Sequence, residues 1–115
     1  MREVCFLSFG VAIVWLASHS VLAADDFSRG QTVYAETCIA CHAADGAGSF
    51  PGVPDLTGKT GLLSQDDAVL LRRMTDGFQS PGSAMAMPPR GGNPVLSDAD
   101  MLSALKYMRK EFQQN

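Results

Sequence analysis

Apolar residues along this chain form four groups, and the last three follow the spacing of an α-helix. The first group is a nearly continuous apolar run from Val4 to Ala17. In the later groups apolar positions recur every three to four residues, which places them on one face of a helix. No segment alternates between apolar and polar residues over a useful length. The pattern therefore predicts an all-α domain.

The first predicted helix of this domain runs from about Asp26 through Cys41. Phe27, Tyr34 and the cysteines near its end fall at helical spacings. Gly30 lies inside this helix, where glycine costs about 1 kcal/mol relative to alanine. We therefore expect another helix to approach closely at Gly30, the alternative being a glycine that is simply tolerated.

Two further helices are predicted at about residues 64–77 and 97–112, after segments rich in glycine and proline. Each begins with a serine that is followed three residues later by an aspartate, a near variant of the capping box. The pairs are Ser64 with Asp67 and Ser97 with Asp100. Arg72 and Arg73, in the middle predicted helix, are expected to be solvated.

The apolar run near the N-terminus predicts a secretory signal peptide over residues 1–23. Arg2 precedes the run, and Val21-Leu22-Ala23 matches the small-x-small pattern before a signal peptidase site. The mature domain would then span residues 24–115 and be periplasmic. An uncleaved membrane anchor is the alternative, but the run is shorter than the roughly 20 residues that span a bilayer. We expect no stable membrane insertion after cleavage.

Composition limits the size and the partners of the mature domain. Removing residues 1–23 from the 115-residue chain leaves 92 residues, which make one domain. The net charge of −3 disfavours nucleic acid as a partner, and the charges are too interspersed to locate a docking patch. A domain this small buries a modest share of its surface. A large apolar cofactor would supply much of its core.

Residues 38–42 read Cys-Ile-Ala-Cys-His, the pattern to which haem is joined covalently. The thiols of Cys38 and Cys41 can add to the two vinyl groups of a porphyrin, which places His42 under the iron as an axial ligand. Cys-x-x-Cys also occurs in thioredoxin-like proteins and zinc sites. The first needs a βαβ setting and the second needs four ligands. Cys38, Cys41 and His42 hold the only thiols and imidazole after the signal, so no structural disulfide is available and haem is favoured.

A second chemical feature is the segment Met85-Ala86-Met87-Pro88-Pro89 between the last two predicted helices. A thioether is soft enough to ligate haem iron. The prolines after Met87 keep the segment extended, because proline disfavours helical geometry in the residue before it. Met87 is therefore the predicted sixth ligand, with Met85, or neither methionine, as the alternatives. Methionines at helical spacings are expected to fill the core: Met74, Met101 and Met108.

With these motifs the chain resembles the class I c-type cytochromes from about Phe27 to Phe112. The Met-Pro-Pro loop is similar to that of the short monohaem bacterial branch. The resemblance implies that the N- and C-terminal helices cross at a contact of Gly30 and Tyr34 with Tyr107. It also implies that the carbonyl of Pro54, twelve residues after His42, binds the ligand imidazole and orients it.

The same resemblance implies a small three-helix fold around one covalently bound haem c. It further implies a soluble carrier of single electrons between protein redox partners, and not an enzyme. His42 and Met87 would fill both axial positions of the iron, which leaves no site for a substrate. Two alternatives remain, a haem subunit of a larger oxidoreductase complex and a ligand-binding haem protein with an open sixth site.

Overall fold

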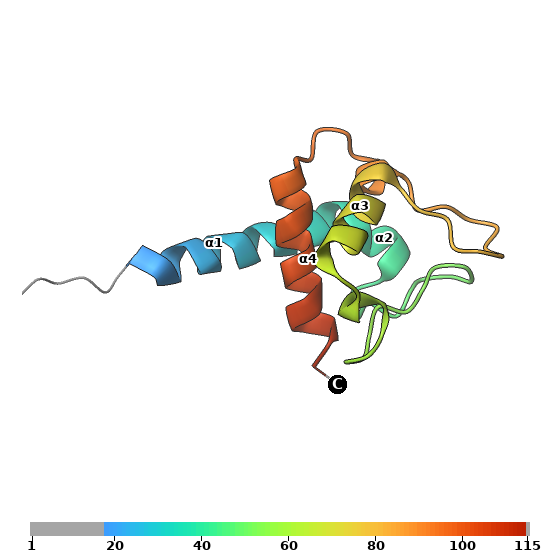
Figure 1. Cartoon of the computed structure of the whole chain (residues 1–115), viewed down its shortest axis with the longest axis horizontal. Helices are drawn as coiled ribbons and strands as arrows, with labels where there is room; N and C mark the ends of the chain where they lie inside the picture. Colours follow the sequence, from blue (N-terminus) through green and yellow to red (C-terminus); the bar gives the residue numbers. More distant parts are fainter. Residues whose placement is uncertain (1–17, 115) are drawn as a thin grey trace, which may run out of the picture.

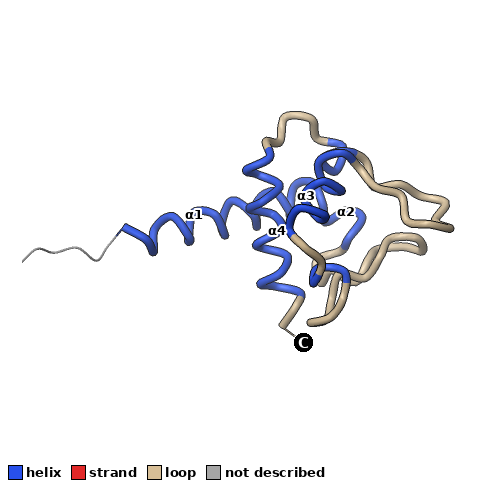
Figure 2. Tube along the Cα trace, in the orientation of Figure 1, coloured by secondary structure: helices blue, strands red, loops and turns tan. Residues whose placement is uncertain are grey.

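The computed structural model describes residues 18–114, which form helices joined by long irregular loops (Figures 1 and 2). A single isolated bridge joins Phe78 and Met87, and the described residues contain no strand. The all-α prediction is confirmed. The helices are α1 (Ser18–Val33), a π-helical turn (Tyr34–Cys38), α2 (Ile39–His42), α3 (Asp67–Asp76) and α4 (Asp98–Phe112), with 3₁₀ turns at Leu62–Ser64 and Pro89–Gly92.

The first helix begins earlier than predicted. It starts at Ser18 and not near Asp26, because no glycine or proline between these two residues breaks it. Its first turns project from the rest of the molecule in Figure 1. No helix within residues 18–114 is long and apolar enough to cross a bilayer. Residues 1–17 of the predicted signal lie outside the described residues, so the cleavage site stays a prediction.

Helices α1 and α4 cross at Gly30, as the sequence predicted (Figure 1). A Cβ atom at Gly30 would lie 2.1 Å from the carbonyl oxygen of Ser103 and 2.8 Å from Cβ of Tyr107. The Tyr34 ring lies 5.5 Å from the Tyr107 ring and 5.2 Å from the Phe112 ring, centroid to centroid. Only glycine permits this approach, and the aromatic rings pack beside it.

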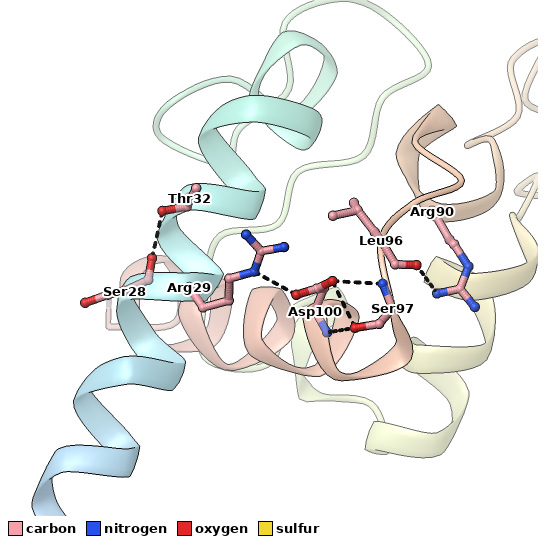
Figure 3. A network of polar contacts seen from close by, with 7 residues as sticks. All are labelled: Ser28, Arg29, Thr32, Arg90, Leu96, Ser97 and Asp100. Atoms are coloured by element: carbon pink, nitrogen blue, oxygen red, sulfur yellow. Dashed lines mark hydrogen bonds and ion pairs between the residues drawn. The ribbon is translucent and has the colours of Figure 1, made fainter.

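Polar contacts fix the start of α4 and its angle to α1 (Figure 3). The predicted capping box is confirmed. The Ser97 hydroxyl accepts from the Asp100 N–H at 3.1 Å, and the Ser97 N–H donates to the Asp100 carboxylate at 2.8 Å. Arg29 of α1 donates to the same carboxylate at 2.7 Å. The hydrogen bond from Arg29, and after it those from Ser97, hold the pKa of Asp100 well below its usual value.

The predicted cap of the middle helix is wrong. Helix α3 begins at Asp67, and the Ser64 hydroxyl donates instead to the Gly61 carbonyl at 2.6 Å, inside a 3₁₀ turn. Gln65 is extended, with ψ of 164°, and separates Ser64 from the helix. Arg109 of α4 holds this junction, since it donates to the Gln65 carbonyl at 2.7 Å and pairs with Asp67. A contact from a distant helix overrides the local capping signal.

The core lies where α4 meets the other helices. The three methionines predicted to fill it are buried, which confirms that prediction. The buried apolar residues are Val33, Tyr34, Leu56, Leu63, Leu70, Met74, Leu96, Met101, Ala104, Leu105, Met108 and Phe112.

Candidate functional site

One apolar cavity gathers every predicted site residue. The helical end of the first segment contributes Cys38, Cys41 and His42, and the loop that follows contributes Pro54. Met87 and Met85, the predicted sixth ligand and its alternative, lie on the wall formed by the loop between α3 and α4. Residues that are more than forty positions apart along the chain therefore share one cavity.

The π-helical turn sets the register of the Cys-x-x-Cys-His segment. The Ile39 N–H bonds to the Tyr34 carbonyl, five residues back rather than four. One extra residue in a turn rotates everything after it by about 100° around the helix axis. The turn therefore changes which face of the helix Cys38, Cys41 and His42 occupy, and these three side chains reach the cavity.

The chain reverses directly after His42. Ala43 has φ 64° and ψ 168°, a region that residues with a Cβ rarely adopt. The buried Tyr34 hydroxyl donates to the Ala43 carbonyl at 2.6 Å, and the Gly48 N–H donates to the His42 carbonyl at 3.1 Å. The backbone on both sides of the imidazole is thus held by buried packing and hydrogen bonds.

His42 has the properties of a metal ligand. Its side chain is half-buried, and burial lowers the pKa of the imidazole, which favours the neutral form that binds metals. Its Nδ1 atom is buried and has no hydrogen-bond partner among the described residues. Pro54 lines the same cavity, but no bond from His42 to its carbonyl is formed here. The orienting role of Pro54 therefore stays a prediction.

The two cysteines are free thiols, Cys38 half-buried and Cys41 exposed. Burial, with a smaller contribution from the charge of Cys41, raises the pKa of Cys38 to about 11. A thioredoxin-like nucleophile needs the opposite, a thiol with a lowered pKa. The Cys38 thiol is thus a poor redox nucleophile, which argues against the thioredoxin-like alternative.

Met87 is better anchored than Met85, although both line the cavity. The Met87 N–H donates to the Phe78 carbonyl at 2.8 Å, and the Phe78 N–H donates to the Met87 carbonyl at 3.0 Å. The Met87 side chain packs against the core. The Met85 side chain is 45% exposed, and its backbone bonds only to the hydroxyl of nearby Ser83.

Sequence reasoning missed two arginines that line this cavity, Arg73 and Arg90. Arg73, which was expected to be solvated, is half-buried and lies on the cavity wall. Its guanidinium lies 4.1 Å from the centroid of the Phe78 ring. Arg73 lies three residues after the buried Leu70, so helical spacing places it beside the apolar stripe, but this spacing does not show that a cavity lies there. Nothing in the sequence around Arg90 marks it as a cavity residue.

The residues on the cavity wall fit a covalently bound haem. The wall is largely apolar and carries two thiols, the thioethers of five methionines (Met74, Met85, Met87, Met101 and Met108) and an imidazole. The buried Nδ1 of this imidazole has no partner within residues 18–114. Arg73 has no hydrogen-bond acceptor among residues 18–114, so its charge is available to an anionic group such as a haem carboxylate. The donor set matches the His and Met ligation of haem iron.

Comparison with known proteins agrees with this fit. The family model described as cytochrome c matches residues 27–111. Cytochrome c-555 of Prosthecochloris aestuarii is 35% identical over 95 residues, which cover 75% of this chain and 88% of that protein. Cytochrome c-555 of Chlorobaculum thiosulfatiphilum is 30% identical over 83 residues, which cover 72% of this chain and 93% of that protein. The FixP subunit of a cbb3-type cytochrome c oxidase from Bradyrhizobium diazoefficiens is 36% identical over 53 residues, which are 45% of this chain and 18% of that protein. The chain therefore belongs to the cytochrome c family, the electron carriers that bind haem c covalently.

Proposed function

We propose that this protein is a soluble, monohaem, periplasmic carrier of single electrons, exported by the signal in residues 1–23. Cys38 and Cys41 form the thioethers to haem, and His42 and Met87 are the axial ligands. The observation that carries the proposal is the single cavity on which these four residues meet.

The donor set explains why the protein would carry electrons rather than catalyse a reaction. Haem c supplies an iron that alternates between the ferric and ferrous states. The neutral imidazole of His42 and the thioether of Met87 leave no open position for a substrate. The soft sulfur favours the ferrous state and so raises the reduction potential relative to bis-His ligation.

The rim of the cavity supports exchange with a protein partner. Two loops, residues 46–54 and 77–89, lie at the same end of the molecule, and neither contains a charged residue (Figure 1). They touch near Gly52, whose Cβ position lies 3.7 Å from the Ser83 hydroxyl and 3.9 Å from Cβ of Met85. Phe50 and Met85 are exposed on these loops. An uncharged apolar rim suits a redox partner with a similarly uncharged contact surface.

A subunit of a larger oxidoreductase is the second candidate, because two relatives are FixP subunits of a cbb3-type cytochrome c oxidase. The matched segment, however, is 18% of FixP, whereas the chain covers 88% and 93% of the two cytochromes c-555. A free carrier is the better supported reading.

Acid-acetone extraction of purified holoprotein tests the covalent attachment. Wild-type protein should retain its haem, and the double variant Cys38→Ala, Cys41→Ala should release it. Cys5→Ala is the matched control, because Cys5 lies in the predicted signal, and it should behave as wild type. Retention of haem by the double variant would contradict the proposal. Ready binding of carbon monoxide by ferrous wild-type protein would favour the open-site alternative.

A further inference from the structure

The loop that follows Met87 contains three successive residues with positive φ. Arg90, Gly91 and Gly92 have φ of 53°, 64° and 86°. Glycine adopts this left-handed conformation at no steric cost, but a residue with a Cβ loses roughly 1–2 kcal/mol. Arg90 is one of two non-glycine residues with positive φ among residues 18–114. Its conformation therefore needs a compensating contact.

The Arg90 side chain supplies that contact. One guanidinium nitrogen donates to the Leu96 carbonyl at 2.7 Å, as Figure 3 shows, and another pairs with Asp98 at 2.6 Å. The Arg90 side chain is 23% exposed and that of Asp98 is 81% exposed. Exposed ion pairs contribute little to stability. The part-buried bond to Leu96, at the entry to α4, is the stronger of the two.

These bonds close the loop that carries Met87 onto the rest of the fold. On one side the bridge to Phe78 holds Met87 itself. On the other side Arg90, three residues later, joins the loop to Leu96. Between them, Gly91 packs against the helix of the cysteines, since a Cβ there would lie 2.7 Å from Cγ2 of Thr37. Thr37 directly precedes Cys38.

We propose that Arg90 is a positioning residue that keeps Met87 on the haem iron. Its guanidinium holds the loop closed, so the thioether leaves the iron less often than it would on a free loop. The inference rests on the proposed role of Met87 as axial ligand. Losing the bond to Leu96 should speed departure of the thioether, while the covalent haem attachment through Cys38 and Cys41 is unaffected.

Binding of imidazole to the ferric holoprotein measures this departure. At saturating imidazole the observed rate is limited by opening of the iron–thioether bond. Arg90→Asn removes the guanidinium but retains a residue that tolerates positive φ. We expect the limiting rate of this variant to rise about tenfold, because the loss of one hydrogen bond from a charged donor corresponds to about that factor. Arg90→Lys should fall between this variant and wild type, and Asp98→Asn should stay near wild type.

Arg109→Lys is the matched control for a purely structural effect. Arg109 also donates to backbone carbonyls, those of Leu63 at 2.9 Å and Gln65 at 2.7 Å, but away from the Met87 loop. This variant should lower stability towards urea and leave the limiting rate unchanged. An equal rate increase in Arg109→Lys would overturn the positioning role.

Limiting rates of Arg90→Asn within about twofold of wild type would also overturn the inference. If Arg90→Asn yields no folded holoprotein, Arg90→Lys provides the same test with a smaller expected increase. The ferric thioether-to-iron absorption band separates this failure from failure of the proposed function. Wild-type protein without that band would refute Met87 ligation itself, whereas a normal band with unchanged rates would refute only the role of Arg90.

Discussion

The two ligand-bearing walls of the cavity are held in different ways. Cys38, Cys41 and His42 end a helical segment that is supported by the crossing at Gly30 and by the buried ring of Tyr34. The second wall is an irregular loop that a few hydrogen bonds hold in place and that contains several residues with positive φ. Covalent attachment therefore depends on the core of the fold. The position of the sixth ligand depends on a loop whose conformation can change without unfolding the domain.

This difference predicts which substitutions will unfold the protein and which will only release a ligand. A change that disrupts the crossing of α1 and α4 removes contacts of the core itself. A change in the loop between α3 and α4 alters few buried contacts, because most residues of this loop are exposed. The effects on stability and on the iron–thioether bond should therefore separate.

The largest loss of stability is expected for Gly30→Val. Its Cβ would lie 2.1 Å from the Ser103 carbonyl oxygen, so α1 and α4 must move apart. We expect the free energy of unfolding to fall by about 3 kcal/mol, at the upper end of overpacking costs. Urea unfolding of the ferric holoprotein measures it. Gln31→Val, at the exposed neighbouring position, should cost less than about 0.5 kcal/mol. Equal stability of the two variants would refute a close crossing.

On the loop, Gly77→Ala should weaken the iron–thioether bond more than it destabilises the fold. Gly77 has φ 84°, and a Cβ would lie 2.9 Å from the Met87 carbonyl oxygen. We expect a stability loss of about 2 kcal/mol and a reduced thioether-to-iron band in the ferric spectrum. Gly82→Ala is the matched control, because Gly82 has φ 80° with nothing within 4 Å of the Cβ position. Gly82→Ala should carry the cost of a positive φ without a steric clash, and it should keep the full thioether-to-iron band.

Ala43→Gly should stabilise the protein on the histidine wall. The φ of 64° and ψ of 168° at Ala43 are accessible mainly to glycine. The free energy recovered by relieving this strain exceeds the free-energy cost of the extra conformational entropy that glycine gives the unfolded chain. We therefore expect the free energy of unfolding to rise by about 1 kcal/mol. Ala44→Gly, at the next residue, which does not have a positive φ, should destabilise by a similar amount. A lower urea midpoint for Ala43→Gly than for wild type would show that the backbone there is unstrained.

The smallest effect concerns the uncharged rim. Electron self-exchange between two copies, followed by NMR line broadening, should slow about fivefold at low salt in Phe50→Glu, because two rims then carry facing negative charges. High salt should restore the rate. Val95→Glu is the control, since Val95 is 84% exposed and lies outside the two rim loops, residues 46–54 and 77–89. Equal slowing by both variants would place the contact surface elsewhere.

The sequence predicted those parts of the molecule whose signals are local. Apolar periodicity gave the helices, and the serine–aspartate pair at Ser97 gave the start of α4. The contiguous motif at residues 38–42 identified the haem-binding segment. The crossing at Gly30 was predicted because a glycine inside a helix carries a cost, which a closely packed neighbouring helix offsets.

The missed features all depend on contacts between distant segments. Ser64 carries a capping signal, yet Arg109 of α4 reaches the same junction and the helix begins later. The π-helical turn that ends at Cys38 follows from no local pattern in the sequence. The roles of Arg73 and Arg90 require knowing that α3 and the Met87 loop share one cavity. Local propensity cannot supply that information.

The ferric absorption spectrum of purified Met87→Ala, compared with Met85→Ala, tests the central claim most directly. Wild-type protein should show the thioether-to-iron band. Met87→Ala should abolish it and lower the reduction potential, because a harder ligand or water replaces the sulfur. Met85→Ala should leave both nearly unchanged. A band that survives in Met87→Ala and disappears in Met85→Ala would contradict the assignment of the second wall.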